Sequence, residues 1–251
     1  MLNNYSGYKI KLLHIIFLSV LAVSPLSLHA AVDDEDEIQS TASLYIWGAG
    51  LKGSTGNAAG GAPVDASFSD ILDNLESGIM WNYRGKGDKW ALGIDYIYLN
   101  ISPSSDAPPA TVDLRETVTE LSVGYEVQPG LEVLAGFRYI DIRTSVMLNV
   151  QPSPPPITGA VDWFDPIVGL DYRRALSGKW KFFGRGDIGG FGVGSDLTWQ
   201  LAGYFGYMPS KNWNLFAGYR HIDVDYESDN DNKFFYDIAI SGPLIGFGYN
   251  F

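Results

Sequence analysis

The sequence has 251 residues, no cysteine, and 29 acidic residues against 17 lysines and arginines, for a formal net charge of −12. The lack of cysteine excludes disulfides, thiol catalysis, thiolate metal sites and the lipid-bearing cysteine of a lipoprotein. The acidic balance argues against nucleic-acid binding, which needs clustered lysine and arginine. Aromatic residues make up 14% of the chain and glycines number 29, a composition typical of many short strands joined by turns.

The N-terminus has the pattern of a secretory signal peptide. Two lysines precede an apolar stretch over residues 12–26, which small residues follow at a suitable cleavage site. The alternative is an uncleaved membrane helix, but the apolar stretch is shorter than the roughly 20 residues that such a helix needs. We therefore predict a signal peptide over residues 1–30, a solvated acidic tail over 31–40 and one domain over 41–251.

The remaining sequence repeats stretches of about ten residues in which apolar and polar side chains alternate, the pattern of transmembrane β-strands. Between Trp90 and Tyr98 the large apolar residues fall on one face of a strand, and Ala91, Gly93 and Asp95 fall on the other. Counted in this way the chain has ten strands; eight is the alternative, because the glycine-rich region 189–195 can be interpreted differently. The predicted strands are 42–52, 76–85, 89–102, 111–127, 131–147, 160–175, 180–193, 196–208, 213–226 and 234–251.

The connections between these strands alternate in length. Tight turns are predicted at 85–88, 128–130, 176–178 and 209–212. Longer loops are predicted at 53–75, 103–110, 149–159 and 227–233. Outer-membrane barrels have short periplasmic turns and longer external loops, so we predict an all-β, antiparallel, up-and-down transmembrane β-barrel. A soluble barrel of the lipocalin type, with its apolar residues inside, is the alternative.

The first long loop contains a helix signal. Ser67 followed by Asp70 is the spacing of a capping box, and Ile71, Leu72 and Leu75 would give a short helix one apolar face. Such a helix could close over the barrel mouth as a lid or pack on the rim as an ordinary loop helix.

The C-terminus carries the most specific signal. From Ile245 onward every second residue is large and apolar, and the chain ends on phenylalanine. Phe247, Tyr249 and Phe251 resemble the last strand that bacterial outer-membrane barrels present to their assembly machinery. The whole of 41–251 resembles the small outer-membrane β-barrel proteins grouped around outer-membrane protein A and its porin-like relatives. The resemblance implies an outer-membrane location, contact with outer-membrane lipid and lipopolysaccharide, and an encounter with the barrel-assembly machinery, but no catalytic or ligand residue.

A four-residue pattern of glycine, apolar, charged and aromatic residues occurs at 93–96, 136–139, 169–172 and 218–221. A charge on the lipid face costs about 2–4 kcal/mol near the membrane midplane, so we expect the glycine and the charge to face the lumen. The predicted band of lumen charges contains Asp95, Arg138, Asp171, Arg185, Asp187 and Arg220. It would act either as a salt-bridge network that closes the interior or as a charged constriction that selects solutes.

His221 is the only histidine beyond the signal peptide. Paired with Asp223 it would be the natural centre of a hydrolase. Alternation directs its ring toward lipid, however, and a catalytic orientation would need a β-bulge.

Two further groups of charges lie in the connections. Acidic residues from Asp223 to Asp231 crowd the last long loop, where they are either solvated or bridged by divalent cations to lipopolysaccharide. Basic residues gather near the short turns, where we expect them to meet anionic phospholipid: Arg84, Lys86, Lys89, Arg173, Arg174, Lys179, Lys181 and Lys211.

The sequence thus predicts an outer-membrane barrel that serves as a narrow passive channel for small solutes or as a structural element of the envelope. We expect no enzyme activity, no cofactor and no metal, since no phosphate loop, metal-ligand spacing or nucleophile elbow is present. Two alternatives remain open: a hydrolase centred on His221, and an adhesin or receptor that acts through the external loops.

Overall fold

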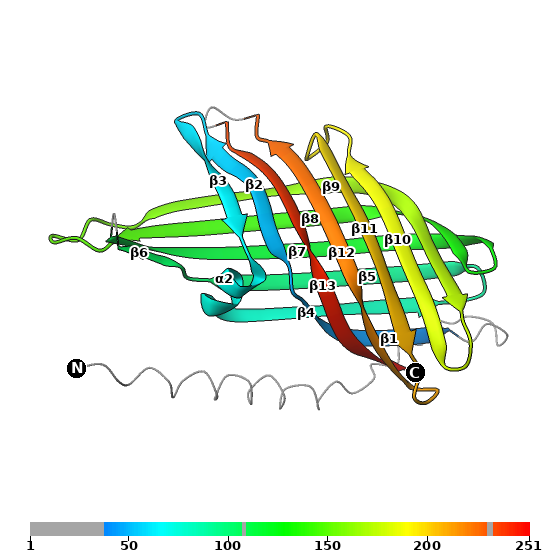
Figure 1. The fold of residues 1–251 in the computed structure, drawn as a ribbon. Helices are drawn as coiled ribbons and strands as arrows, with labels where there is room; N and C mark the ends of the chain where they lie inside the picture. Colours follow the sequence, from blue (N-terminus) through cyan, green and yellow to red (C-terminus); the bar gives the residue numbers. More distant parts are fainter. Residues whose placement is uncertain (1–37, 107–108, 230–232) are drawn as a thin grey trace, which may run out of the picture. The chain divides into compact units, whose positions relative to one another are not determined.

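Residues 38–106, 109–229 and 233–251 are described by the computed structural model, and they form an antiparallel β-barrel (Figure 1). The predicted signal peptide and most of the acidic tail lie outside the described residues. Ten of the described strands form the ring, which the pairing of β1 with β13 closes. The predicted ten-stranded barrel is therefore confirmed, and the alternative count of eight is excluded.

The ring strands are β1 (Gln39–Trp47), β4 (Leu75–Lys86), β5 (Trp90–Ile101), β7 (Pro109–Gln128), β8 (Leu131–Leu148), β9 (Ile157–Ala175), β10 (Trp180–Gly190), β11 (Leu197–Tyr207), β12 (Trp213–Glu227) and β13 (Phe235–Asn250). Strands β10 and β11 have 11 residues each, close to the 9–11 or so that cross a bilayer at a tilt of about 45°. Strands β7, β8 and β9 have 20, 18 and 19 residues and extend well beyond β10 and β11 at one end of the barrel (Figure 1).

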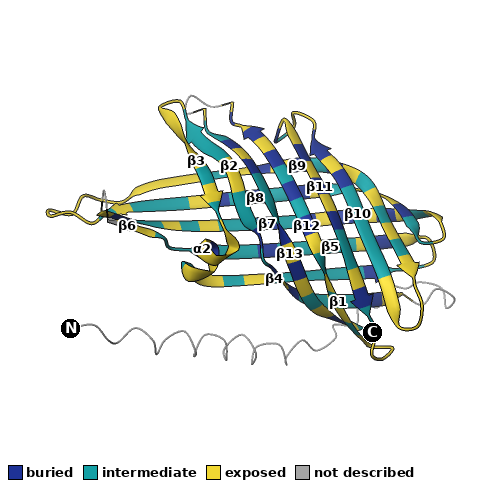
Figure 2. Cartoon of the chain, in the orientation of Figure 1, coloured by how far each residue is buried: buried dark blue, intermediate teal, exposed yellow. Residues whose placement is uncertain are grey.

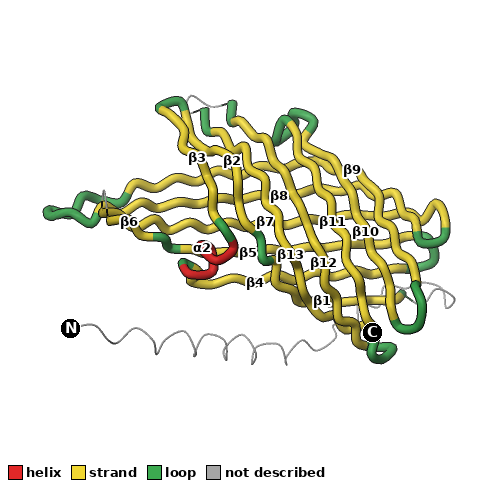
Figure 3. The backbone as a smooth tube through the Cα atoms, in the orientation of Figure 1, coloured by secondary structure: helices red, strands yellow, loops and turns green. Residues whose placement is uncertain are grey.

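The two ends of the barrel differ in their connections (Figure 3). At one end, here called the turn end, lie the tight turns after β4, β7, β9 and β11, together with the start of β1 and the end of β13. Gly130 makes one of these turns possible, because its φ of +78° is a left-handed conformation that glycine adopts without strain. The opposite end, here called the loop end, carries the remaining connections.

The first long connection differs from the predicted loop at 53–75. Strand β1 ends at Trp47. After a break, the chain continues as β2 (Gly50–Asn57), which pairs with residues 235–241 at the start of β13. Strand β3 (Gly60–Ala66) then folds back onto β2 as a hairpin. The Asn57 side chain accepts a hydrogen bond from the backbone N–H of Ala59 at 2.9 Å, which stabilises the turn between them.

The predicted helix follows as α2 (Phe68–Asp73). Its capping box is present: Asp70 N–H donates to Ser67 Oγ at 3.3 Å, and Ser67 N–H donates to Asp70 Oδ2 at 2.9 Å. The Ser67 hydroxyl also donates to Asp70 Oδ2 at 2.5 Å, and this bond, together with the one from Ser67 N–H, holds the pKa of Asp70 below its usual value. Ile71 is buried whereas Leu72 is exposed, and Leu75 belongs to β4 rather than to the helix.

Three other boundaries differ from the predicted ones. The predicted loop at 103–110 contains a short strand, β6 (Ser104–Asp106), which pairs with the start of β7. Strand β9 begins at Ile157, inside the loop predicted at 149–159. Strand β10 ends at Gly190, since residues 191–196 form a turn.

Apolar side chains cover the outside of the barrel, and buried polar groups lie inside. Along β5, Trp90 is 61% exposed on the outer face while its neighbour Ala91 is 4% exposed. Figure 2 shows the same alternation of buried and exposed residues along most ring strands. Arg138 and Asp165 are fully buried inside the ring, the reverse of a soluble barrel. The lipocalin alternative is therefore wrong, and the outer surface is suited to a bilayer.

Among the residues that the structure describes, no helix is both long enough and apolar enough to span a membrane.

Candidate functional site

A row of charged residues crosses the inner wall of the barrel. The strand register places Asp95 of β5 opposite Glu120 of β7, Glu120 opposite Arg138 of β8, and Arg138 opposite Asp165 of β9. Residues directly opposite one another share a face of the sheet, so all four point into the lumen.

Arg138 is the centre of this network. Its Nη2 donates to Glu120 Oε2 at 3.0 Å and to Asp187 Oδ1 at 2.7 Å, and its Nη1 donates to Thr198 Oγ1 at 3.1 Å. Arg185 contacts the same two carboxylates, with Nε 2.8 Å from Asp187 and Nη2 2.5 Å from Glu120. Two guanidinium groups are thus neutralised by two carboxylates.

A second part of the network is built around Arg220. Its Nη1 donates to Asp95 Oδ2 at 2.7 Å and its Nε donates to Gln200 Oε1 at 2.6 Å. The Gln200 amide donates in turn to Asp187 Oδ2 at 2.8 Å, and the Tyr45 hydroxyl donates to Asp95 Oδ1 at 2.7 Å. Gln200 therefore joins the two parts. We call the six charged members the charge band: Asp95, Glu120, Arg138, Arg185, Asp187 and Arg220.

The structure brings together five of the six residues predicted for the lumen band. Asp171 lies nearer the turn end, where its carboxylate is 3.7 Å from Arg173 Nη2 and 4.0 Å from Arg84 Nη1. In the ladders of β9, Asp171 lies opposite Glu132 of β8 and Arg185 of β10, whereas Asp165 lies opposite Arg138.

Sequence reasoning missed Glu120, Asp165, Gln200 and Tyr45. Glu120 and Asp165 lie on the inward faces of predicted strands, so alternation alone could have found them. Gln200 and Tyr45 carry no charge, and their roles depend on which strands face each other across the lumen.

On the loop-end side of the charge band, apolar side chains fill the interior. The Trp163 and Tyr226 rings stack with centroids 4.0 Å apart and planes 9° apart. Trp163 Nε1 donates to Asp165 Oδ2 at 3.1 Å, which joins this filling to the charged row. We call these residues the apolar plug: Ile97, Val118, Ile140, Ile142, Trp163, Ile222, Val224, Tyr226, Tyr236 and Ile238.

On the turn-end side, the strands enclose a cavity of about 990 Å³, here called the vestibule. Its lining includes residues of the turns, such as Met208 and Asn212, and residues at the start of β1 and after the end of β13, such as Phe251. The cavity therefore opens at the turn end. In its wall Arg84 Nη2 donates to both oxygens of Glu132, at 2.6 and 2.7 Å.

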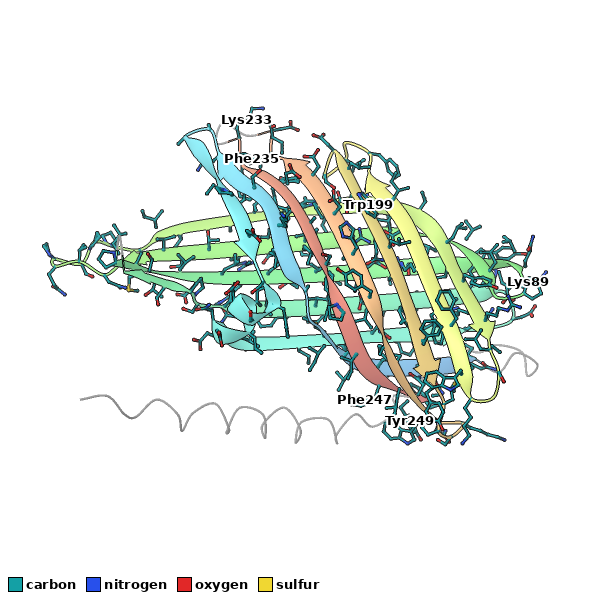
Figure 4. All side chains as sticks on the ribbon, viewed as in Figure 1. Lys89, Trp199, Lys233, Phe235, Phe247 and Tyr249 are labelled. Carbon is teal, nitrogen blue, oxygen red and sulfur yellow. The ribbon has the colours of Figure 1, made fainter. Side chains whose placement is uncertain are left out.

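The basic residues near the turns are placed differently from the prediction. Of the eight expected to meet phospholipid, six line the vestibule: Arg84, Lys86, Arg173, Arg174, Lys181 and Lys211. Arg84, Lys86, Arg173 and Lys181 occupy inward positions of their strands, so alternation directs them into the lumen instead of toward lipid. Lys89 and Lys179 lie outside this lining (Figure 4 labels Lys89).

His221 lies on the outer face of β12. Its ring packs against Trp199 of β11 with centroids 4.5 Å apart, and its Nε2 is 4.0 Å from Asp223 Oδ2 (Figure 4 labels Trp199). The pairing of β12 with β11 and β13 runs through His221 without a bulge. Its side chain therefore points away from the charge band and the vestibule.

The acidic region from Asp223 to Asp231 is described only in part, because residues 230–232 lie outside the described residues. Within the described ranges, no group of three or more histidine, aspartate or glutamate side chains is placed to hold a metal ion.

The C-terminal aromatic residues decorate the outer face at the turn end. Phe247 and Tyr249 project outward from β13 (Figure 4), and the Tyr249 ring lies 5.1 Å from Trp213 and 6.2 Å from Phe251. Aromatic rings at this level are typical of the girdle that meets a membrane interface.

No protein-family model matches the sequence, and no curated protein matches it. Among solved structures, the chain is similar to the outer membrane protease OmpT from Escherichia coli, with a TM-score of 0.49, 11% identity, and coverage of 88% of this chain and 98% of that one. It is also similar to Ail, the attachment invasion locus protein of Yersinia pestis, with a TM-score of 0.42, 10% identity, and coverage of 86% and 100%. Neisserial surface protein A matches with a TM-score of 0.34 at 13% identity, over 87% of this chain and all of that one. Likenesses this distant carry no inference about what this chain binds or does.

Proposed function

We propose that the protein is an integral barrel of the outer membrane, with its turn end toward the periplasm, and that it is a sealed structural element of the envelope. The observation that carries this proposal is the charge band together with the apolar plug behind it. Of the two roles that the sequence predicts, channel or structural protein, this arrangement favours the second.

The charge band has the chemistry of a closure. Three guanidinium groups face three carboxylates, and Arg138 and Asp187 are buried. Charges removed from water are tolerated when they are paired and hydrogen-bonded. Each of the three guanidinium groups forms an ion pair with a carboxylate of the band, although Arg138 Nε has no hydrogen-bond partner among the described residues. A selectivity filter instead presents charges of one sign to passing ions. A ten-stranded ring is also close to the eight-stranded size at which side chains fill the interior.

The two alternatives draw less support from the geometry. A hydrolase centred on His221 would work on the outer face of a continuous β-ladder, where backbone N–H groups are engaged between strands and do not form an oxyanion hole. An adhesin or receptor would use the β2–β3 hairpin, α2 and the extensions of β7 to β9, and no contact of these elements points to a particular partner.

The test is the ion conductance of purified, refolded protein in a planar bilayer, with heat-modifiable mobility on a gel as the check that the barrel has folded. We expect no steady conductance steps from the wild-type protein. An Arg138→Ala, Arg220→Ala variant, which opens the charge band, serves as the comparison. A stable, ion-selective conductance of the folded wild-type barrel would overturn the proposal in favour of a channel.

A further inference from the structure

The vestibule has the size of a ligand site. Its volume of about 990 Å³ lies at the upper end of the range of about 300–1,000 Å³ that is common for small-molecule pockets. The charge band forms its inner end, since Asp95, Glu120, Arg185 and Arg220 are among the lining residues. A molecule that enters from the turn end therefore meets paired charges there.

Within the part of the chain that the structure describes, several cations at the mouth of the vestibule form no ion pair. Among the described residues, the side chains of Arg174, Lys181 and Lys211 form no ion pair and no hydrogen bond, and all three line the cavity. The protein as a whole is acidic, with a net charge of −12. A local excess of unpaired positive charge in a cavity attracts anions.

Arg173 brings a further cation deeper into the vestibule. Its nearest carboxylate, Asp171, is 3.7 Å away and is shared with Arg84, which lies 4.0 Å from it. Arg173 Nε is buried and has no hydrogen-bond partner among the described residues. A buried donor without a partner costs free energy, which an acceptor on a bound anion would recover.

Aromatic rings lie beside these cations. The Arg173 guanidinium is 5.3 Å from the centre of the Phe183 ring, which stacks on Tyr204 with centroids 5.3 Å apart. Phe216 lies 5.8 Å beyond Tyr204, and all three rings line the vestibule. Such rings offer flat apolar surface that an inorganic ion would not use.

We propose that the vestibule binds a soluble organic anion, a carboxylate, phosphate or sulfonate joined to a flat or apolar group. Arg173 and Lys181 hold the anionic group, and Phe183 and Tyr204 cover the apolar part. The mouth opens among the turns along the barrel axis, which favours a solute from the aqueous side over a lipid from the bilayer. This binding is independent of whether the barrel conducts, so the two proposals fail separately.

A trianionic dye, hydroxypyrene trisulfonate, is a suitable probe because it combines a flat ring with fixed negative charge and stays out of neutral detergent. Its fluorescence anisotropy is measured against folded protein at low salt. We expect saturable binding to the wild-type protein and about a tenfold or greater loss of affinity in an Arg173→Gln, Lys181→Gln variant, since two charge-assisted contacts disappear.

The matched control is a Lys89→Gln, Lys179→Gln variant, which removes the same charge from the turn end but from outside the vestibule lining. We expect its affinity to match that of the wild type. Equal losses in the two variants would show general electrostatic attraction, and an unchanged affinity in the vestibule variant would show binding elsewhere. Either result, or an absence of saturable binding to the wild type, overturns the proposal.

A second comparison separates a solute from a lipid headgroup. The dye is titrated into nanodiscs of phosphatidylcholine, and again after a small share of that lipid is replaced by phosphatidylglycerol. For a soluble ligand, we expect the dye to bind the wild-type protein in both. Loss of saturable binding in the presence of phosphatidylglycerol would assign the cations to a lipid headgroup and contradict the choice of a solute.

Discussion

Toward the loop end the barrel interior is filled by the apolar plug, whereas toward the turn end the same ten strands enclose the vestibule. Both halves obey the same alternation of inward and outward side chains. They differ in what occupies the inward positions: branched and aromatic residues such as Ile140 and Trp163 in one half, and smaller or charged residues such as Ser43, Asn82 and Lys181 in the other. Alternation thus decides which side a residue faces, while the volume and charge of the inward residues decide whether the lumen is filled.

The largest effect is expected where the two halves meet. Arg138→Ala leaves the buried carboxylates of Glu120 and Asp187 with one cation fewer. Removal of one partner from a buried ion pair destabilises a protein by about 3–5 kcal/mol. The free energy of unfolding, from urea titration of the folded barrel in vesicles, should fall by that amount. Arg143→Ala is the control, since Arg143 pairs with Asp141 on the exposed surface, where loss of a pair costs about 0–1 kcal/mol. Similar losses in both variants would mean that the charge band is not a buried network.

The apolar plug should respond to truncation more strongly than the lipid-facing surface. Ile238 is 1% exposed inside the barrel and Ile245 on the same strand is 66% exposed outside it. We expect Ile238→Ala to lower the free energy of unfolding by about 2–5 kcal/mol, because it leaves a cavity. Ile245→Ala should cost under about 1 kcal/mol, since lipid fills the space that the side chain leaves. Equal losses in the two variants would show that the lumen at the loop end is loosely packed and filled with solvent, and would contradict the apolar plug.

Close packing of neighbouring strands supports the charge band. A Cβ at Gly169 would lie 2.3 Å from the carbonyl oxygen of Gly186 and 2.6 Å from Asp187 Cβ, so glycine leaves room for Asp187 to reach Arg138. Gly169→Ala should therefore cost about 1–3 kcal/mol through overpacking. Gly87→Ala is the matched change in an open turn, where the nearest atom is 3.9 Å away, and it should leave the stability unchanged. Urea titration of the two variants side by side checks this difference.

The smallest effect concerns α2, outside the membrane-spanning part. Ser67→Ala removes the hydroxyl that donates to Asp70 Oδ2, which is the main cause of the lowered pKa of Asp70. That pKa should therefore rise part of the way toward its ordinary value, since the backbone N–H of residue 67 still donates to the carboxylate. The Asp70 carboxylate supports the start of the helix above its unfolded pKa, and this support is lost as the pH falls through the lowered folded value. Carboxyl chemical shifts of Asp70 followed by NMR against pH test the change. An unaltered titration in the variant would contradict the capping box.

The strand count and the facing of each strand follow from local patterns, which is why both could be predicted. The β2–β3 hairpin could not, because residues 50–66 show little apolar alternation and β2 is held by its ladder with β13, far away in the sequence. The contacts of Asp171 have a similar cause. It lies opposite Arg185 in the ladder of β9 with β10, yet its carboxylate contacts Arg173 and also Arg84 of β4, a strand that is not its neighbour in the ring.

The most direct test asks whether the apolar plug closes the lumen at the loop end, and it relies on the absence of native cysteine. Single thiols are introduced by Asn82→Cys in the vestibule and Ile222→Cys in the apolar plug, and each barrel is exposed to a membrane-impermeant maleimide from one side at a time. We predict that Asn82→Cys is modified only from the turn end and that Ile222→Cys is modified from neither side. Modification of Asn82→Cys from the loop end, or of Ile222→Cys from either side, would contradict a sealed barrel.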